Sequence, residues 1–275
     1  MIEPTPGHVC RRSIILAACA LPGLVFAQPK TVVLRCPGPP VAADTRAGFY
    51  LDLLDLVMKK GGSTYRIEPN GEFLTGQQVL ERLPEERGIN LAWGTGSHGW
   101  DERLWQVAVP IDKGILGWRL VLIKKRDRAR FAAIRTLQDL ERLAAGQQRD
   151  WSDVAILRAN GLKLVDLPSY EGLFPALAAD RFQYLPRGIA EIRDEEKRFE
   201  SLDLIIEPTI ALHYRQQSYF YVSRKNPGLH DMIERGMRAA IADGSYEILF
   251  DRYNGEAIRR ANLDARRVFE LKMPD

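Results

Sequence analysis

Apolar residues at two different spacings predict a strand followed by a helix at the start of the folded chain. Residues 31–35 form a β-branched apolar run of the kind that a buried strand requires. A helix is predicted next, because apolar residues recur at helical spacing and Gly61 follows as an end signal. The apolar positions of this helix are Phe49, Leu53, Leu54 and Val57, and its candidate caps are Asp44 and Thr45.

The same alternation continues along the chain. Strands are predicted over 64–68 and 89–93, and the helix between them, over 77–83, stops at Pro84. The resulting β-α-β-α-β order is typical of a parallel sheet that is covered by helices. Two further strands complete this part of the pattern, over 106–111 and 116–123.

A second unit of the same kind begins near Thr136, which is expected to form a capping box with Asp139. Its helices are expected over 136–145, 151–160, 169–179 and 189–199, and its strands over 162–166, 182–186, 202–207 and 218–224. Helices follow over 229–242, 246–253 and 256–263. We therefore expect an α/β chain with lobe one over 28–115, lobe two over 116–223, and a helical return to lobe one over 224–275.

The first 27 residues, 1–27, have the features of a secretory signal peptide. Arg11 and Arg12 precede an apolar stretch over 14–26, which is too short to span a membrane, and small residues precede an expected cleavage before Gln28. The mature chain is therefore expected in the periplasm. Two alternatives stay open, namely a lipoprotein anchor at Cys19 and export by a twin-arginine route.

Composition narrows the class of partner. The 275 residues carry 39 Lys and Arg against 36 Asp and Glu, and this near balance gives no reason to expect a nucleic-acid partner. Removal of the signal peptide would leave Cys36 as the remaining cysteine, so no intramolecular disulfide is expected and Cys36 is interpreted as a small buried residue. A monomer is expected.

Five short motifs carry a resemblance to a known family. They are Leu91–Thr95, Asp101–Arg103, Val107–Ile111, Tyr219–Asn226 and Asp243–Tyr246. In order and spacing they resemble the type 2 periplasmic binding proteins, the group that contains the amino-acid receptors of ABC importers, over nearly all of residues 30–255. The resemblance implies two helix-covered, mostly parallel sheets joined by a two-strand hinge, with a solute bound between the lobes.

The resemblance also implies ligand contacts in lobe one. In amino-acid receptors the arginine at the position of Arg103 forks onto the ligand carboxylate, which its planar paired donors fit. Trp93, Gly94 and Thr95 lie where a strand end meets the cleft. Thr95 would donate a hydroxyl hydrogen bond there, and Trp93 would stack on the ligand. A surface role for Arg103 and a core role for Trp93 are the alternatives.

Lobe two departs from the family pattern. Amino-acid receptors place an aspartate there for the ligand ammonium, and Arg187 falls near that position in this chain. Two arginines facing one cleft would favour a second anionic group, as in a dicarboxylate, keto acid or phosphorylated solute. Glu191 lies one helical turn further on. It would either neutralise Arg187, which would then have a structural role, or replace the missing acceptor for the ligand ammonium.

Helix starts and turns supply further candidates. Trp151, Ser169 and Tyr170 begin predicted helices whose N-terminal amides would suit an anion, although most helix starts are simply capped. Residues 113–114 and 117–118 flank the first crossing between the lobes and are candidate hinge positions. Ordinary turns are the alternative for both pairs.

The sequence predicts a binding protein rather than an enzyme. His98, His213 and His230 do not lie at metal-ligand spacing, and no nucleophile or phosphate-binding motif occurs, so no metal, cofactor or catalytic residue is expected. We expect capture of a small carboxylate-bearing solute by hinge closure, for an ABC-type importer. The alternatives are a sensory or partner-docking module with a receptor, and a dehydratase-like enzyme using His98 with Asp101 or Glu102.

Overall fold

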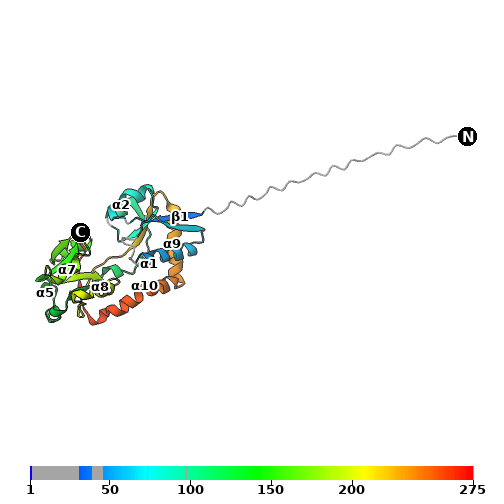
Figure 1. Ribbon diagram of the computed structural model, residues 1–275. Helices are drawn as coiled ribbons and strands as arrows, with labels where there is room; N and C mark the ends of the chain where they lie inside the picture. Colours follow the sequence, from blue (N-terminus) through cyan, green and yellow to red (C-terminus); the bar gives the residue numbers. More distant parts are fainter. Residues whose placement is uncertain (2–30, 39–45, 73, 97, 275) are drawn as a thin grey trace. The chain divides into compact units, whose positions relative to one another are not determined.

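The computed structural model describes Met1 and residues 31–38, 46–72, 74–96 and 98–274 (Figure 1). The predicted signal peptide with its alternatives, and the candidate caps of the first helix, lie outside the described residues. Thr31–Asp275 forms one compact unit, in which the strands and cores separate into two lobes. This is the two-lobed α/β architecture that the sequence predicts.

The first lobe is built on two small sheets. Its elements are β1 (Val32–Cys36), α1 (Arg46–Lys60), β2 (Tyr65–Pro69), α2 (Gly76–Arg82), η1 (Leu83–Glu85), β3 (Leu91–Gly94), α3 (His98–Arg103), β4 (Leu104–Gln106), β11 (Tyr219–Ser223), α9 (Pro227–Ala242) and most of α10 (Ser245–Ala261). β1 pairs in parallel with β2, and β11 lies between β3 and β4, antiparallel to both. The first lobe is therefore formed by two stretches of the chain, one before and one after the main part of the second lobe in the sequence.

Helices α1 and α9 pack closely because Gly236 has no side chain. A Cβ atom on Gly236 would lie 2.1 Å from the carbonyl oxygen of Val57. The close approach brings Leu53, Ile233 and Met237 into one buried core with the strands. The apolar positions that predicted α1 from the sequence are those that face this core.

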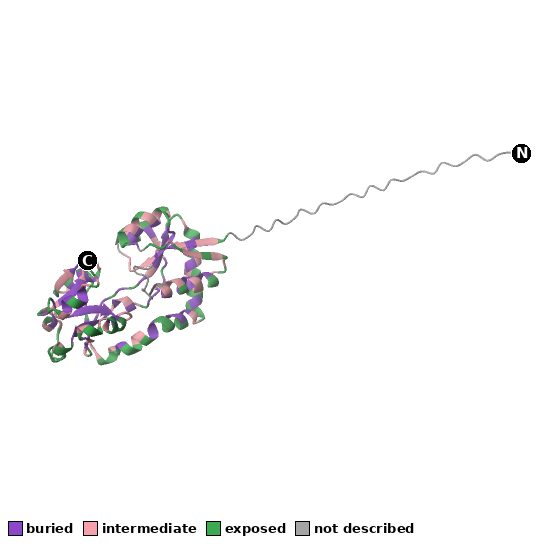
Figure 2. Ribbon diagram, viewed as in Figure 1, coloured by how far each residue is buried: buried purple, intermediate pink, exposed green. Residues whose placement is uncertain are grey.

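The second lobe is built around β5, a strand that is buried along most of its length (Figure 2). Its elements are η2 (Ile115–Gly117), β5 (Trp118–Lys124), η3 (Lys125–Asp127), α4 (Arg128–Ala132), α5 (Leu137–Glu141), β6 (Ala144–Gln148), α6 (Asp153–Ala159), β7 (Lys163–Leu167), α7 (Leu173–Ala178), β8 (Leu185–Gly188), α8 (Ile192–Arg198), η4 (Glu200–Leu202), β9 (Leu204–Ile206), β10 (Ile210–His213), η5 (Leu263–Ala265) and β12 (Arg267–Glu270). β5 pairs antiparallel with β8, β9 and β10, while β12 joins β10 and β6 joins β7 in parallel.

Helix α10 is a third connection between the lobes, beside the two crossing segments that the hinge prediction requires. Tyr246 and Phe250, near its start, belong to the core of the first lobe, and Ala261, at its end, belongs to a core of the second. Figure 1 shows α10 running from α9 towards the second lobe. The chain then adds β12 to the edge of β10, so the final strand lies in the second lobe.

Some predicted elements were wrong. The helix predicted over 136–145 ends at Glu141, and Ala144–Gln148 is strand β6. Alanine and glutamine favour a helix, but Gly146 lies against the ring of Phe182, where a Cβ atom would be 2.2 Å from the ring. Pairing with β7 therefore outweighs the local preference.

Other differences concern element boundaries. The strand predicted over 106–111 is confined to β4, and the residues after it run between the lobes as a crossing segment. The two helices predicted after Gly244 are one, because Asn254 and Gly255 are buried within α10. Strands β10 and β12 were missed, since each is only four residues long.

Candidate ligand-binding site

A cavity of about 670 Å³ lies where the two lobes meet the segments that cross between them. Thr95 and Tyr219 line it from the first lobe, and Trp118 and Ser152 from the second. This volume is in the range of small-molecule sites. The cavity is therefore the candidate site for a solute.

The crossing segments, residues 107–117 and 214–218, are bound to each other beside the cavity. One carboxylate oxygen of Asp112 accepts the backbone N–H groups of Gly114 at 3.0 Å and Ser218 at 3.1 Å. Asp112 is only 1% exposed, and burial raises the pKa of its carboxyl, although these backbone donors oppose the rise. Because its bonds join both segments, Asp112 couples the two crossings.

Lys113 and Gly114 both adopt left-handed backbone conformations, with φ values of 52° and 74°. The ammonium of Lys113 is paired with Glu247 on α10 and lies 4.7 Å from the centre of the Phe250 ring. Its charge is thus largely satisfied by the third connection, even though Lys113 lines the cavity.

Stacked rings form the wall of the cavity on the second lobe. The rings of Trp118 and His213 lie 4.1 Å apart with an interplanar angle of 28°. The Nδ1 atom of His213 is 2.7 Å from a carboxylate oxygen of Glu270 on β12. The last strand therefore holds the imidazole of His213 in its stacked position.

The residues after β12 form another part of this wall. The side-chain amide of Asn160, at the end of α6, donates to the carbonyl of Lys272 and accepts from its N–H, both at 2.8 Å. This pair of bonds fixes the backbone beside the cavity. Met273 and Pro274, which follow, line the cavity.

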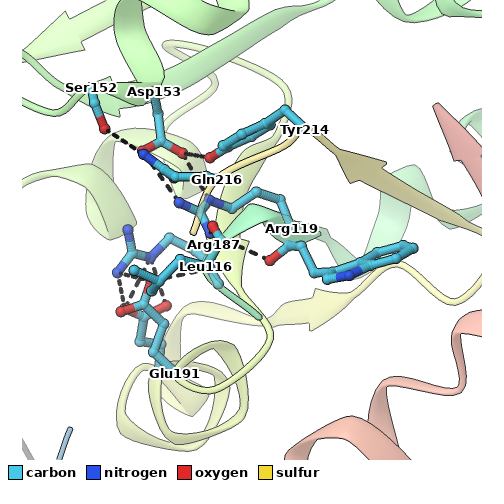
Figure 3. Close-up of polar contacts among 11 residues, drawn as sticks. Leu116, Arg119, Ser152, Asp153, Arg187, Glu191, Tyr214 and Gln216 are labelled. Carbon is cyan, nitrogen blue, oxygen red and sulfur yellow. Dashed lines mark hydrogen bonds and ion pairs between the residues drawn. The ribbon is translucent and has the colours of Figure 1, made fainter. Parts of the chain in front are cut away.

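A buried polar network supports the same wall (Figure 3). The guanidinium of Arg119 donates to Asp153 at 2.7 Å and 3.3 Å, and the hydroxyl of Tyr214 donates to the same carboxylate. The amide of Gln216 reaches the hydroxyl of Ser152 at 3.4 Å. Contacts between α6, β5 and the second crossing segment therefore position the polar residues of the cavity.

The Asp153 carboxylate makes the stability of the second lobe depend on pH. Burial alone would raise the pKa of Asp153, but the charge and hydrogen bonds of Arg119, together with Tyr214, outweigh burial and hold the pKa below 3.8. A depressed pKa in the folded state stabilises the fold above the unfolded-state value of about 3.9, and the contribution is lost as pH falls through the folded value.

We therefore expect the free energy of unfolding of the wild type to fall more steeply between neutral and strongly acidic pH than that of Asp153→Asn. Urea unfolding across this pH range measures the difference. Asp150→Asn, at a neighbouring exposed position, is the matched control and should keep the wild-type slope. Equal slopes for wild type and Asp153→Asn would show that the ion pair with Arg119 is not formed in solution.

The charges around the cavity are not balanced. No aspartate or glutamate is among the residues that line it within the described part of the chain. Of the cationic lining residues, Lys113 is paired with Glu247, whereas Arg215 is exposed and makes no ion pair or hydrogen bond with a described residue through its side chain. Among the described residues, the guanidinium of Arg215 is therefore a positive charge at the cavity without a carboxylate partner.

The structure distributes the predicted contacts of the first lobe differently. Thr95 lines the cavity, and Gly94 pairs with Tyr219, another lining residue. Trp93 instead stacks on Tyr50, with ring centres 5.3 Å apart, and packs against the core of the first lobe. The core alternative for Trp93 is the one that the geometry supports.

Arg103 is exposed and does not line the cavity. It precedes β4, whose first residue Leu104 pairs with Ser223 at the far end of β11. Tyr219, which lines the cavity, is at the opposite end of that strand. Strand register therefore separates Arg103 from the cavity, and this geometry supports the surface alternative for Arg103.

Arg187 comes together with Trp151 and Tyr170, but inside the second lobe. Its guanidinium binds Glu195 at 2.6 Å and Glu191 at 3.0 Å (Figure 3) and lies 4.4 Å from the centre of the Trp151 ring. The Tyr170 hydroxyl donates to Glu195 at 2.8 Å. Since Arg187 is 6% exposed and bonded to carboxylates, the geometry supports its structural alternative over the cleft role.

Ser169 also lies away from the lining, and its hydroxyl accepts from the N–H of Gly172 at 3.4 Å. Among the residues that do line the cavity, sequence reasoning missed Arg215, His213 and Met273 as site residues. The short apolar run of β10 was the available signal, because a strand there would have placed the residues after it in the second crossing.

The described residues give no sign of a metal site or of a disulfide. Within them, no group of three histidine, cysteine or acidic side chains is arranged to hold a metal ion. Cys36 is buried, and burial raises the pKa of its thiol to about 12, as expected for a small core residue. No helix in the described part of the chain has the length and apolar character that crossing a membrane demands.

Neither a family model nor a curated protein matches the sequence. Solved structures do match. YckB from Bacillus subtilis is 16% identical, with 87% of this chain and 96% of that chain covered and a TM-score of 0.58. The GluR0 ligand-binding core from Nostoc punctiforme, solved with L-glutamate, is 15% identical, with 82% and 99% covered and a TM-score of 0.54.

A histidine kinase sensor domain with similarity to periplasmic binding proteins also matches, at 16% identity, with 82% of this chain and 97% of that chain covered and a TM-score of 0.54. At these identities the likeness establishes the fold. The chain has the two-lobed periplasmic-binding-protein fold, at low sequence identity to these structures.

Proposed function

We propose that the protein is an extracytoplasmic solute-binding protein that captures a small carboxylate-bearing solute between its lobes. The observation that carries the proposal is the cavity of about 670 Å³, which both lobes and both crossing segments line. The fold matches that of the GluR0 ligand-binding core solved with L-glutamate, a carboxylate-bearing molecule. The expected signal peptide supports a periplasmic location for the mature chain.

Capture is proposed to occur by closure of the lobes about the crossing segments. Such a movement would be concentrated at the left-handed turn of Lys113 and Gly114, and at Gly117, whose backbone lies close to the carbonyl oxygen of Tyr214. The lobes proposed from the sequence, 28–115 with 224–275 and 116–223, would move against each other, except that the end of α10 and strand β12 would move with the second lobe. Helix α10 joins both lobes, so closure has to tilt or bend this helix as well.

We propose an ABC-type importer as the destination of the solute, and a sensory receptor as the second candidate. The fold match to a histidine kinase sensor domain favours the second candidate. Deleting the gene for this protein in its native cell distinguishes the importer from the sensor. Loss of solute uptake supports the importer, whereas intact uptake with a lost transcriptional response supports the sensor.

A catalytic role is not proposed. The dehydratase-like alternative needs an acid–base group beside the solute, and Asp101 and Glu102 are exposed residues outside the cavity lining. The side chain of His98 lies outside the described part of the chain. Turnover of a bound solute by the purified protein would reverse this conclusion.

Thermal unfolding of the exported protein against a panel of amino acids, dicarboxylates, keto acids and phosphorylated solutes tests the proposal. A ligand at a hundred times its dissociation constant is expected to add about 2.7 kcal/mol of stability, because it binds the folded state alone. The increase is measured as a raised unfolding midpoint.

Ala155→Trp tests whether the solute binds in the cavity. Ala155 is an exposed lining residue on α6, and an indole there would occupy part of the cavity. The variant should fold normally and lose the ligand-induced shift. An unchanged shift would place the bound solute elsewhere on the protein. No shift with any solute in the wild type would contradict the proposed function.

A further inference from the structure

We infer that Arg215 is the residue that binds the charged group of the solute, and that the solute is an organic anion without an ammonium group. This inference rests on the proposed function, because it concerns the same cavity. It names an arginine in the second crossing segment in place of Arg103 and Arg187.

The backbone around Arg215 is held on both sides. Tyr214 is fully buried and donates its N–H to the carbonyl of Gly117 at 3.2 Å, while its hydroxyl binds Asp153 (Figure 3). On the other side, Gln216 is 8% exposed and reaches Ser152. Buried and exposed residues alternate along this segment: Tyr214 and Gln216 are buried, whereas Arg215 is exposed and lines the cavity. Arg215 is thus presented to the cavity by a fixed backbone.

The other basic groups near the cavity already have carboxylate partners. Lys113 is paired with Glu247, and the imidazole of His213 contacts Glu270. In the wall behind them, Arg119 is held by Asp153. Arg215 has no such partner among the described residues, so its guanidinium is available to a ligand.

The lining also lacks a group that would receive an ammonium. Among the described residues, its side chains include hydroxyls, amides and aromatic rings, such as those of Thr95, Ser152, Gln217 and Trp118, but no carboxylate. An ammonium in this cavity would meet the guanidinium of Arg215 without a countercharge. A carboxylate or phosphate would instead receive paired, charge-assisted hydrogen bonds from it.

The geometry of the remaining wall suits a short carbon skeleton. Trp118 offers an aromatic ring on the second lobe, and Tyr219 offers a ring on the first. Closure of the lobes would shelter the contact with Arg215 from water and strengthen it. Dicarboxylates, keto acids and phosphorylated carbon compounds fit this arrangement, and the choice among them is left to the experiment.

Isothermal titration of the exported protein with five probes tests the inference. Succinate, 2-oxoglutarate and glycerol 3-phosphate are anions without an ammonium, and L-glutamine and L-arginine carry one. At least one of the three anions is expected to bind the wild type, and neither amino acid. Arg215→Gln should weaken that binding by about 10- to 150-fold, the range of a charge-assisted hydrogen bond. Arg215→Lys should lose less, because it keeps the charge without the fork.

Arg130→Gln is the matched control, since Arg130 is an exposed arginine of the second lobe outside the cavity and its loss changes the net charge equally. It should bind within about twofold of the wild type. Arg215→Gln should keep the wild-type unfolding midpoint, because the side chain is exposed.

Two results would overturn the inference in different ways. Binding of an amino acid to the wild type, unaffected by Arg215→Gln, would disprove the role of Arg215 and leave the proposed function intact. Failure of all probes, together with the absence of any shift in the wider thermal panel, would remove the proposed function and the inference together.

Discussion

Replacing Arg187 with methionine is expected to lower the free energy of unfolding by about 3–5 kcal/mol. Its guanidinium makes three hydrogen bonds of 2.6–2.9 Å to Glu195, and both residues are buried. Methionine fills a similar volume but leaves the carboxylate of Glu195 buried without a countercharge, which is the costly outcome. Urea unfolding at neutral pH measures the change.

Arg198→Met is the matched control for this variant. Arg198 pairs with Glu171 at 2.7 Å in the same lobe, but the two side chains are 57% and 55% exposed. Its loss is therefore expected to cost at most about 1 kcal/mol. The double variant Arg187→Met with Glu195→Leu should recover much of the lost stability, because it removes both buried charges. A similar loss of unfolding free energy in Arg187→Met and Arg198→Met would show that Arg187 is not held by a buried ion pair and is a candidate for ligand binding.

Gly117→Ala is expected to cost about 1–3 kcal/mol of stability and to weaken solute binding. A Cβ atom at this position would lie 2.1 Å from the carbonyl oxygen of Tyr214, so the two crossing segments would have to separate. Because Tyr214 precedes Arg215, their separation would displace the proposed anion-binding residue. Urea unfolding and titration with the best anion of the panel measure the two effects.

Gly228→Ala is the control for glycine replacement. Gly228 lies near the start of α9, and a Cβ atom there would meet nothing within 4 Å. Alanine favours the helix, so stability should stay equal or rise slightly, with binding unchanged. If Gly117→Ala behaves in the same way, the backbone contact between the crossing segments is not rigid and does not position the site.

The third connection distinguishes this chain from a simple two-strand hinge. Helix α10 and β12 carry contacts from Lys113 in the first crossing segment to His213 at the cavity wall. Movement of the lobes would therefore be communicated to both sides of the cavity. The helical tail that the sequence predicts contains this helix. Local patterns do not reveal that the helix ends in the second lobe.

Much of the fold was predictable because its signals are local. The helical spacing of Leu53 and Val57 predicts the buried face of α1, and that face packs against α9 in the structure. The order and spacing of five short motifs were enough to indicate the two-lobed fold, which the solved structures confirm. By contrast, Ala144 and Ala145 favour a helix locally and form a strand because β7 and Phe182 lie beside them.

The sequence by itself determined the two-lobed α/β fold, the location of the first crossing segment, and the presence of several arginines that are suited to an anion. Only the tertiary structure decided which arginine is available. Glu195 buries and neutralises Arg187, strand register carries Arg103 to the far end of its sheet, and Arg215 is presented to the cavity without a partner among the described residues. The physical reason is that the charge and accessibility of a side chain depend on its neighbours in space, which local spacing along the chain does not specify.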